Sequence, residues 1–204
     1  MLLFVLMIMS CSKEENIKNI VNKEISKKGG ENMKKVLFIV AQKDFRDDEL
    51  FKPKEVLEKN GFVVDVASLE RGKAYGADGG VIDVVSIRDV NIDDYVFIGI
   101  VGGPGALSLD KEKVANVVKE FYGKGKPIGA ICIAPVILAK AGLLDGVKAT
   151  VWKSPDGSTV KTLEDYGATY VSKDVVVDKN IITANGPHAA VSYGEKILEL
   201  ISKI

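Results

Sequence analysis

Short apolar runs alternate along residues 35–204 with segments whose apolar residues recur every three or four positions. The apolar runs contain few polar residues, as in strands that are buried on both faces of a parallel sheet. The pattern over Val81–Val90 fits either a pair of strands or an irregular connection. The strands expected from the other runs are Val36–Ala41, Phe62–Ala67, Tyr95–Val101, Pro127–Ile131, Asp174–Val177 and Ile181–Ala184.

The segments between these strands have the apolar spacing of helices that pack one face against a sheet. In the clearest case, a helix from about Asp110 to Gly123 carries four apolar residues on one face, namely Val114, Val117, Val118 and Phe121. Further helices are expected over Asp48–Lys59, from beyond Cys132 to Gly142, over Ser158–Tyr166 and from Ala190 to Ile201. This alternation predicts an α/β domain with a mostly parallel sheet that is covered on both faces.

The loops at one edge of the predicted sheet carry the residues that could take part in catalysis. In open α/β sheets, ligands bind beyond the carboxyl ends of the strands. Four loops leave those ends, at Gln42–Glu49, Gly102–Gly105, Cys132–Pro135 and Asn185–His188. They contribute a carboxylate, a glycine turn, a thiol and the only histidine of the chain. We therefore expect a functional site at this edge.

Cys132 lies in the segment Lys126–Pro135, whose pattern indicates a short buried strand that runs into a helix. A thiol at a helix N-terminus meets unpaired backbone N–H groups and the positive end of the helix dipole. Such a position lowers a cysteine pKa from about 8.5 to about 3.5–7.5, which favours the thiolate. The alternative is a packed structural cysteine, because a free cysteine behaves as a small hydrophobic residue. The neighbouring loops favour the reactive thiol.

Glu49 is the carboxylate of this sheet edge. One interpretation is that Glu49 only complements the dipole of the helix that begins near Asp48. In the other interpretation, its carboxyl group is hydrogen-bonded to the sulfur of Cys132. A protonated carboxyl group would donate to the thiolate, and an ionised one would act as a base.

The turn Gly102-Gly-Pro-Gly105 differs from the common phosphate-binding loops. It lacks the spacing and the lysine of a P-loop, and it does not match G-x-G-x-x-G. Its glycines allow a close approach of the backbone and unusual dihedral angles. Together with the N–H of Ile133, the N–H groups of the turn would form an oxyanion hole for attack on a carbonyl.

His188 and Trp152 each have two interpretations. A lone histidine is either a solvated or capping residue, or a proton-transfer partner at the active edge. Trp152 fits packing or the wall of a pocket better than a catalytic role. We retain His188 as a candidate catalytic residue on the basis of its position in the Asn185–His188 loop.

Composition and charge exclude several classes of function. The 204 residues contain 28 Lys plus Arg and 28 Asp plus Glu, so no net charge attracts a nucleic acid. Two cysteines and one histidine do not make a disulfide framework or a usual zinc site. No metal and no cofactor are therefore expected.

The N-terminal residues 1–34 consist of an apolar run and a polar, charge-rich linker. The run Leu2–Met9 is shorter than the roughly 20 residues that span a bilayer. With Cys11 it resembles the lipid-attachment signal of bacteria, although no basic residue precedes it. The alternative is a misassigned start, with Met33 as the native first residue. We expect a cytoplasmic domain over residues 35–204, and membrane anchoring or export only if the segment up to Cys11 is a real signal.

These residues together resemble the ThiJ/PfpI superfamily. The likeness covers residues 35–204 and rests on six motifs, which are Met33–Val40, Asp47–Leu50 with Pro53, Gly102–Gly105, Ala130–Pro135, Leu143-Leu144 and Asn185–Pro187. It implies a flavodoxin-like three-layer sandwich, similar to that of the class I glutamine amidotransferases. It also implies that Cys132 is the nucleophile, that Glu49 is its carboxyl partner, and that Gly103 and Ile133 supply the oxyanion-hole amides. Members of the superfamily are dimers or larger rings, so a homo-oligomer is expected.

One residue departs from the protease-like branch of the superfamily. That branch has histidine directly after the elbow cysteine, where this chain has Ile133. The leading hypothesis is therefore a cysteine-dependent enzyme that acts on small reactive carbonyls or their protein adducts, of the glyoxalase or deglycase type. The alternative enzyme is an intracellular cysteine peptidase or amide hydrolase. The non-enzymatic alternative is a redox sensor or chaperone that uses oxidation of Cys132.

Overall fold

The computed structural model describes residues 33–203. Two predictions concern the N-terminal residues 1–34, namely the lipid-attachment signal and the misassigned start. Of this segment only residues 33 and 34 are described, so the predictions for the rest lie outside the described residues. Within the described part, no helix is long and apolar enough to cross a membrane.

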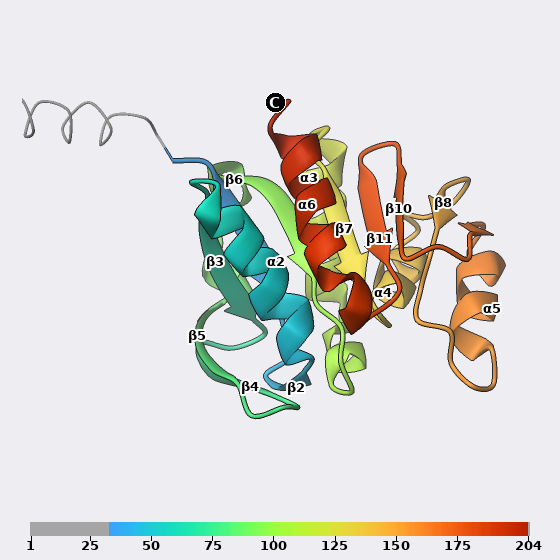
Figure 1. Ribbon diagram of the computed structural model, residues 1–204, viewed down its shortest axis with the longest axis horizontal. Helices are drawn as coiled ribbons and strands as arrows, with labels where there is room; N and C mark the ends of the chain where they lie inside the picture. Colours follow the sequence, from blue (N-terminus) through green and yellow to red (C-terminus); the bar gives the residue numbers. More distant parts are fainter. Residues whose placement is uncertain (1–32, 204) are drawn as a thin grey trace, which may run out of the picture. The chain divides into compact units, whose positions relative to one another are not determined.

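A nine-stranded sheet forms the centre of the described domain, with strand order β10-β11-β7-β6-β1-β3-β5-β4-β2 (Figure 1). The strands from β11 to β5 run parallel, while β10 and β4 are antiparallel to their neighbours β11 and β5. The bounds are β1 Lys35–Ile39, β2 Lys43–Phe45, β3 Val63–Ser68, β4 Gly72–Gly76, β5 Val81–Ser86, β6 Tyr95–Ile100, β7 Ile128–Ile131, β10 Val175–Asp178 and β11 Ile181–Ala184. A separate pair, β8 Lys148–Ala149 and β9 Thr169–Tyr170, is also parallel.

Helices cover both faces of the sheet, which confirms the predicted flavodoxin-like three-layer α/β fold. The helices α2 (Asp47–Lys59) and α6 (Ala190–Ile201) lie side by side on one face (Figure 1). They approach closely, because a Cβ atom on Gly194 would lie only 2.8 Å from the Cα of Pro53. The helices α3 (Glu112–Gly123), α4 (Pro135–Lys140) and α5 (Ser158–Asp165) contribute to the core of the other face.

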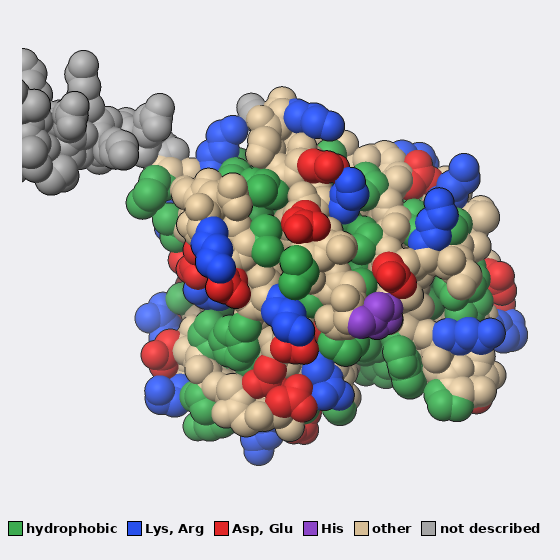
Figure 2. Space-filling model, viewed as in Figure 1, with side chains coloured by type: hydrophobic (Ala, Val, Ile, Leu, Met, Phe, Trp, Pro, Cys, Tyr) green, Lys and Arg blue, Asp and Glu red, His purple; other side chains and the backbone are tan. Residues whose placement is uncertain are grey.

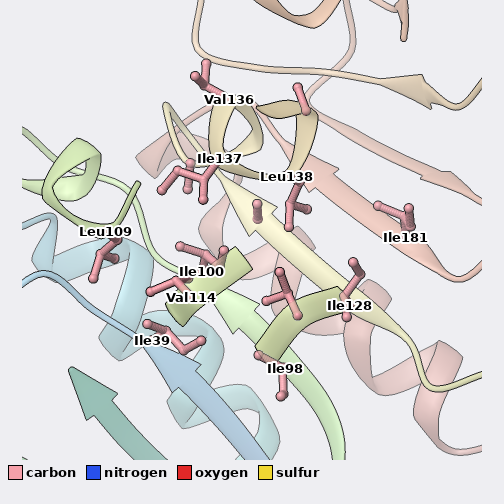
Figure 3. Close-up of a cluster of buried hydrophobic side chains, with 14 of the residues drawn as sticks. Ile39, Ile98, Ile100, Leu109, Val114, Ile128, Val136, Ile137, Leu138 and Ile181 are labelled. Carbon is pink, nitrogen blue, oxygen red and sulfur yellow. The ribbon is translucent and has the colours of Figure 1, made fainter. Parts of the chain in front are cut away.

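Alternate residues of the central strands belong to two separate cores. In β1, Leu37 and Ile39 pack with α3 and α4, whereas Val36 and Phe38 pack on the side of α2 and α6. Figure 3 shows the first cluster, in which side chains from β1, β6 and β7 meet those of α3 and α4. This arrangement explains the unbroken apolar runs in the sequence, since both faces of each strand are buried.

Four strands, β2, β4, β8 and β9, were not predicted from the sequence. The stretch Gln42–Glu49 was predicted as a loop, but it contains β2 and the first turn of α2. The uncertain stretch Val81–Val90 contains only β5 and a 3-10 turn, and the antiparallel partner of β5 is β4, further back in the chain. All four are short and contain no apolar run, and β2 and β4 lie at one end of the nine-stranded sheet.

The surface agrees with the balanced charge of the sequence. On the face that carries α2 and α6, acidic and basic side chains are interspersed (Figure 2). Several pairs along α2 are ion pairs four residues apart, such as Lys52 with Asp48 at 2.7 Å. Exposed pairs of this kind contribute little stability, typically below about 1 kcal/mol.

Candidate active site

Cys132 occupies a strained turn directly after β7. Its φ of 64° lies in the left-handed region, which is unfavourable for a residue with a side chain. The turn is held on both sides, because the Cys132 N–H donates to Ala184 O and its carbonyl oxygen accepts from the Trp152 N–H, both at 2.8 Å. Strain that persists only because its surroundings enforce it is typical of functional sites.

The glycine turn lies against the same elbow. A Cβ atom on Gly102 would lie 2.5 Å from Glu49 Oε2 and 2.6 Å from Cys132 Cβ. Gly103 has a φ of 108°, and a Cβ there would overlap the Arg46 backbone nitrogen. The prediction that these glycines permit close backbone approach is therefore confirmed, and the absence of a side chain at Gly102 leaves room for the carboxyl group beside the thiol.

Glu49 lies in the first turn of α2 and is completely buried. Neither of its carboxyl oxygens has a well-formed hydrogen-bond partner among the described residues. The nearest polar groups are the Cys132 thiol and the Gly102 N–H, which only partly offset the effect of burial on the carboxyl group. A carboxyl group that merely complemented the helix dipole would remain in solvent, so this burial favours the interpretation of Glu49 as a partner of the thiol.

Burial and mutual repulsion set the ionisation of this pair. Desolvation raises the pKa of Glu49 to about 7. Desolvation, followed by the charge of Glu49, raises the pKa of Cys132 to about 12. Two such coupled groups titrate as one unit. Between these two values the pair therefore holds one negative charge and one shared proton.

The expectation of a lowered thiol pKa is wrong. The helix α4 begins three residues after Cys132, at Pro135, and has only six residues. The backbone N–H groups of Gly103 and Ile133 do lower the pKa of Cys132, as an oxyanion hole would, but burial and the neighbouring carboxyl group outweigh them. The group that influences the thiol most directly is thus the Glu49 carboxyl group rather than a helix dipole.

A cavity of about 400 Å³ with mostly apolar walls opens over the elbow. It brings together four of the five residues proposed from the sequence, which are Glu49, Gly103, Cys132 and Ile133. Its other lining residues are Arg46, Pro104, Trp152 and Pro187. Trp152, with 40% of its surface exposed, forms part of the wall, as expected for a pocket residue.

His188 is the candidate that the structure does not bring into the cavity. Its neighbour Pro187 lines the cavity, but the His188 side chain is 62% exposed. The ring nitrogen Nε2 lies 3.2 Å from Asp174 Oδ1 at the surface. We therefore do not assign His188 a role at the thiol.

Two neighbours of Glu49 were not singled out from the sequence as site residues. Arg46 lines the cavity, and Asp47 accepts hydrogen bonds from the Asp78 and Gly80 N–H groups at 2.8 and 2.5 Å. Asp47 thereby fixes the turn between β4 and β5 against the start of α2. The only available sequence signal was the position of both residues directly before the Asp48-Glu49 pair.

Comparison with known proteins matches this architecture to a class in which a cysteine elbow follows a strand of an α/β sandwich. The DJ-1/PfpI family profile matches residues 34–200. An uncharacterized protein of Methanocaldococcus jannaschii is 48% identical over 178 residues, covering 85% of this chain and 86% of that protein. A deglycase of Thermococcus kodakarensis is 32% identical over 173 residues, covering 82% and 99%. The crystal structure of a ThiJ/PfpI domain protein from Brachyspira murdochii superposes with a TM-score of 0.80 at 25% identity, covering 84% and 98%.

The chain therefore belongs to the DJ-1/PfpI family. The ThiJ/PfpI resemblance inferred from the sequence motifs is confirmed by the matched profile, the relatives and the solved structure.

Proposed function

We propose that this protein converts small 2-oxoaldehydes, free or released from reversible protein adducts, into 2-hydroxy acids by means of Cys132. The observation that carries the proposal is the Glu49–Cys132 pair, a fully buried carboxyl group next to the thiol of a residue in a strained turn. Such a pair stores one proton next to a nucleophile inside a mostly apolar cavity. The deglycase activity named for the relative from Thermococcus kodakarensis supports the same class of substrate.

The first step is addition of the thiol sulfur to the aldehyde carbon. A C–S bond forms, the C=O π bond breaks, and the proton shared by the pair passes to the carbonyl oxygen. The amides of Gly103 and Ile133, which face the sulfur in the free protein, are placed to stabilise the developing oxyanion.

The second step is a proton transfer within the bound substrate. The ionised Glu49 removes the proton from the carbon bonded to sulfur and returns it to the adjacent carbonyl carbon through an enediol. The first carbon is thereby oxidised to a thioester and the second is reduced to an alcohol, so no external oxidant is needed. Water then cleaves the thioester and restores the thiol.

The peptidase alternative lacks the imidazole that would take up the proton of the thiol. Ile133 occupies the position after the elbow cysteine, and the only histidine of the chain lies at the surface beside Asp174. A cysteine peptidase needs an imidazole within hydrogen-bond reach of its thiol. The redox-sensor alternative uses the same pair of residues and is distinguished from the enzyme by turnover.

Wild-type protein incubated with methylglyoxal is expected to form lactate, measured by proton NMR, and the His188→Ala variant should retain this rate within about twofold. The exposed ring of His188 makes no contact with the cavity, and surface substitutions of this kind have small effects. Absence of lactate from wild type would exclude the proposed function. A loss above about tenfold in His188→Ala would show that the histidine serves the thiol after all.

A further inference from the structure

The cavity over Cys132 contains one positive charge that the proposed reaction does not use. Among the described residues that line the cavity, Arg46 alone is cationic. Its backbone N–H donates to Gly102 O at 3.1 Å, which fixes Arg46 beside the glycine turn. Its charge acts on Glu49, whose ionised form it favours, and on Cys132.

The guanidinium group of Arg46 is only partly occupied. Its Nη1 donates to both carboxylate oxygens of Asp78, at 2.9 and 3.1 Å. Within residues 33–203, neither Nε nor Nη2 of Arg46 donates a hydrogen bond to the protein. Asp78 is itself held by Asp47, so the guanidinium is fixed from the side of the β4–β5 turn. A guanidinium with free N–H groups in a fixed position is suited to bind a carboxylate.

Glu49 supplies a second, independent indication of a polar ligand. Both of its oxygens are buried without a well-formed hydrogen bond, with only the Cys132 thiol and the Gly102 N–H nearby, and the residue lines the same cavity as Arg46. Buried polar atoms are nearly always hydrogen-bonded, so a buried carboxyl group that lines a cavity without a well-formed hydrogen bond is suited to receive one from a bound ligand. A ligand with a carbonyl oxygen for the Glu49–Cys132 pair and a negative group for Arg46 would satisfy both residues.

We propose that Arg46 forms an anion subsite and that the cavity binds 2-oxo acids, in which a carboxylate is attached directly to the carbonyl carbon. This inference rests on the proposed function in that Cys132 adds to the carbonyl. In the adduct the C–S bond forms, the π electrons move to the carbonyl oxygen, and that oxygen takes the proton shared by Glu49 and Cys132. The ligand carboxylate stays at Arg46, and the total charge is unchanged. The 2-hydroxy acid product of the proposed reaction would occupy the same subsite.

The test compares glyoxylate with its neutral methyl ester as ligands of the full-length protein. Each ligand is titrated against iodoacetamide, and its dissociation constant is read from protection of the Cys132 peptide by mass spectrometry. We expect Arg46→Gln to weaken glyoxylate binding by about 10- to 100-fold, the range for loss of a charge-assisted hydrogen bond, and the ester by less than about threefold. The matched control is Arg71→Gln, which removes an exposed arginine paired with Asp89 outside the cavity and should change neither constant.

Equal weakening of both ligands in Arg46→Gln would overturn the inference, because Arg46 would then act only on the reactivity of Cys132. Unchanged glyoxylate binding would overturn it as well. Glyoxylate has no second carbonyl carbon that can be reduced to an alcohol, so its binding is measured without turnover. If the protein forms lactate from methylglyoxal but Arg46→Gln does not selectively weaken protection by glyoxylate, only the anion subsite is disproved. If Arg46→Gln selectively weakens glyoxylate protection but no lactate forms, only the proposed reaction is disproved.

Discussion

The Cys132→Ser variant is expected to turn over methylglyoxal at least about 1,000-fold more slowly than wild type, because removal of a nucleophile leaves only binding and oxyanion stabilisation. Serine preserves the shape of the side chain and the strained φ of 64°, so the fold should persist. A hydroxyl group ionises far less readily than a thiol, and in this buried position its pKa would be raised further. Lactate formation by stopped assay gives kcat, and the urea midpoint reports folding.

The matched control is Cys11→Ser, which changes the only other cysteine of the chain. It should retain wild-type kcat within about twofold. If Cys132→Ser keeps a rate close to wild type while it remains folded, then the thiol is not the nucleophile and the assignment of the elbow fails.

The Glu49→Leu variant is expected to be more stable than wild type above pH 7, by a free energy of unfolding on the order of 3 kcal/mol. Burial raises the pKa of Glu49 from 4.5 to about 7. Below about pH 4.5 the carboxyl group is protonated in both the folded and the unfolded chain and causes no penalty. As pH rises to 7 the unfolded chain loses this proton first, so wild-type stability falls, at about 1.4 kcal/mol for each pH unit. Leucine removes this penalty.

The same variant should lose activity by about 100-fold or more, because the proton of the first step and the base of the second step are both removed. Urea unfolding at pH 4.5 and pH 8, together with kcat, measures both effects. The control is Asp48→Asn, which removes the adjacent exposed carboxylate and should change stability by no more than about 0.5 kcal/mol. Equal stability of Glu49→Leu and wild type at pH 8 would show that the buried carboxyl group is not destabilising.

The central strands and the glycine turn could be predicted from the sequence because their signals are local. An apolar run such as Val36–Ala41 reflects burial on both faces, and three glycines in four positions indicate close backbone approach. The short strands β2 and β4 could not be predicted, since they contain polar residues and no apolar run, and β2 pairs with a segment far along the chain. Register and pairing of such strands are decided by tertiary contacts.

The candidate site divides in the same way. Cys132 and Glu49 were found because a sheet edge collects the loops after its strands. The direction of the pKa change at Cys132 could not be predicted, because desolvation depends on the residues packed around the sulfur and not on its neighbours in the chain. Arg46 was missed for a related reason, since its position in the cavity depends on Asp78, in the turn between β4 and β5, which accepts a hydrogen bond from its side chain.

The most direct test of the account is the rate at which iodoacetamide alkylates Cys132 between pH 5 and pH 10, in wild type and in Glu49→Gln. Burial and the charge of Glu49 raise the pKa of Cys132 to about 12, so the wild-type rate should still be rising at pH 10. Glu49→Gln removes the charge but not the burial, so its rate should rise at lower pH than the wild-type rate, with a midpoint still above the ordinary thiol value of about 8.5. Identical pH profiles in the two proteins, or a wild-type midpoint at or below about 8.5, would contradict the coupling of the two groups on which the proposed function depends.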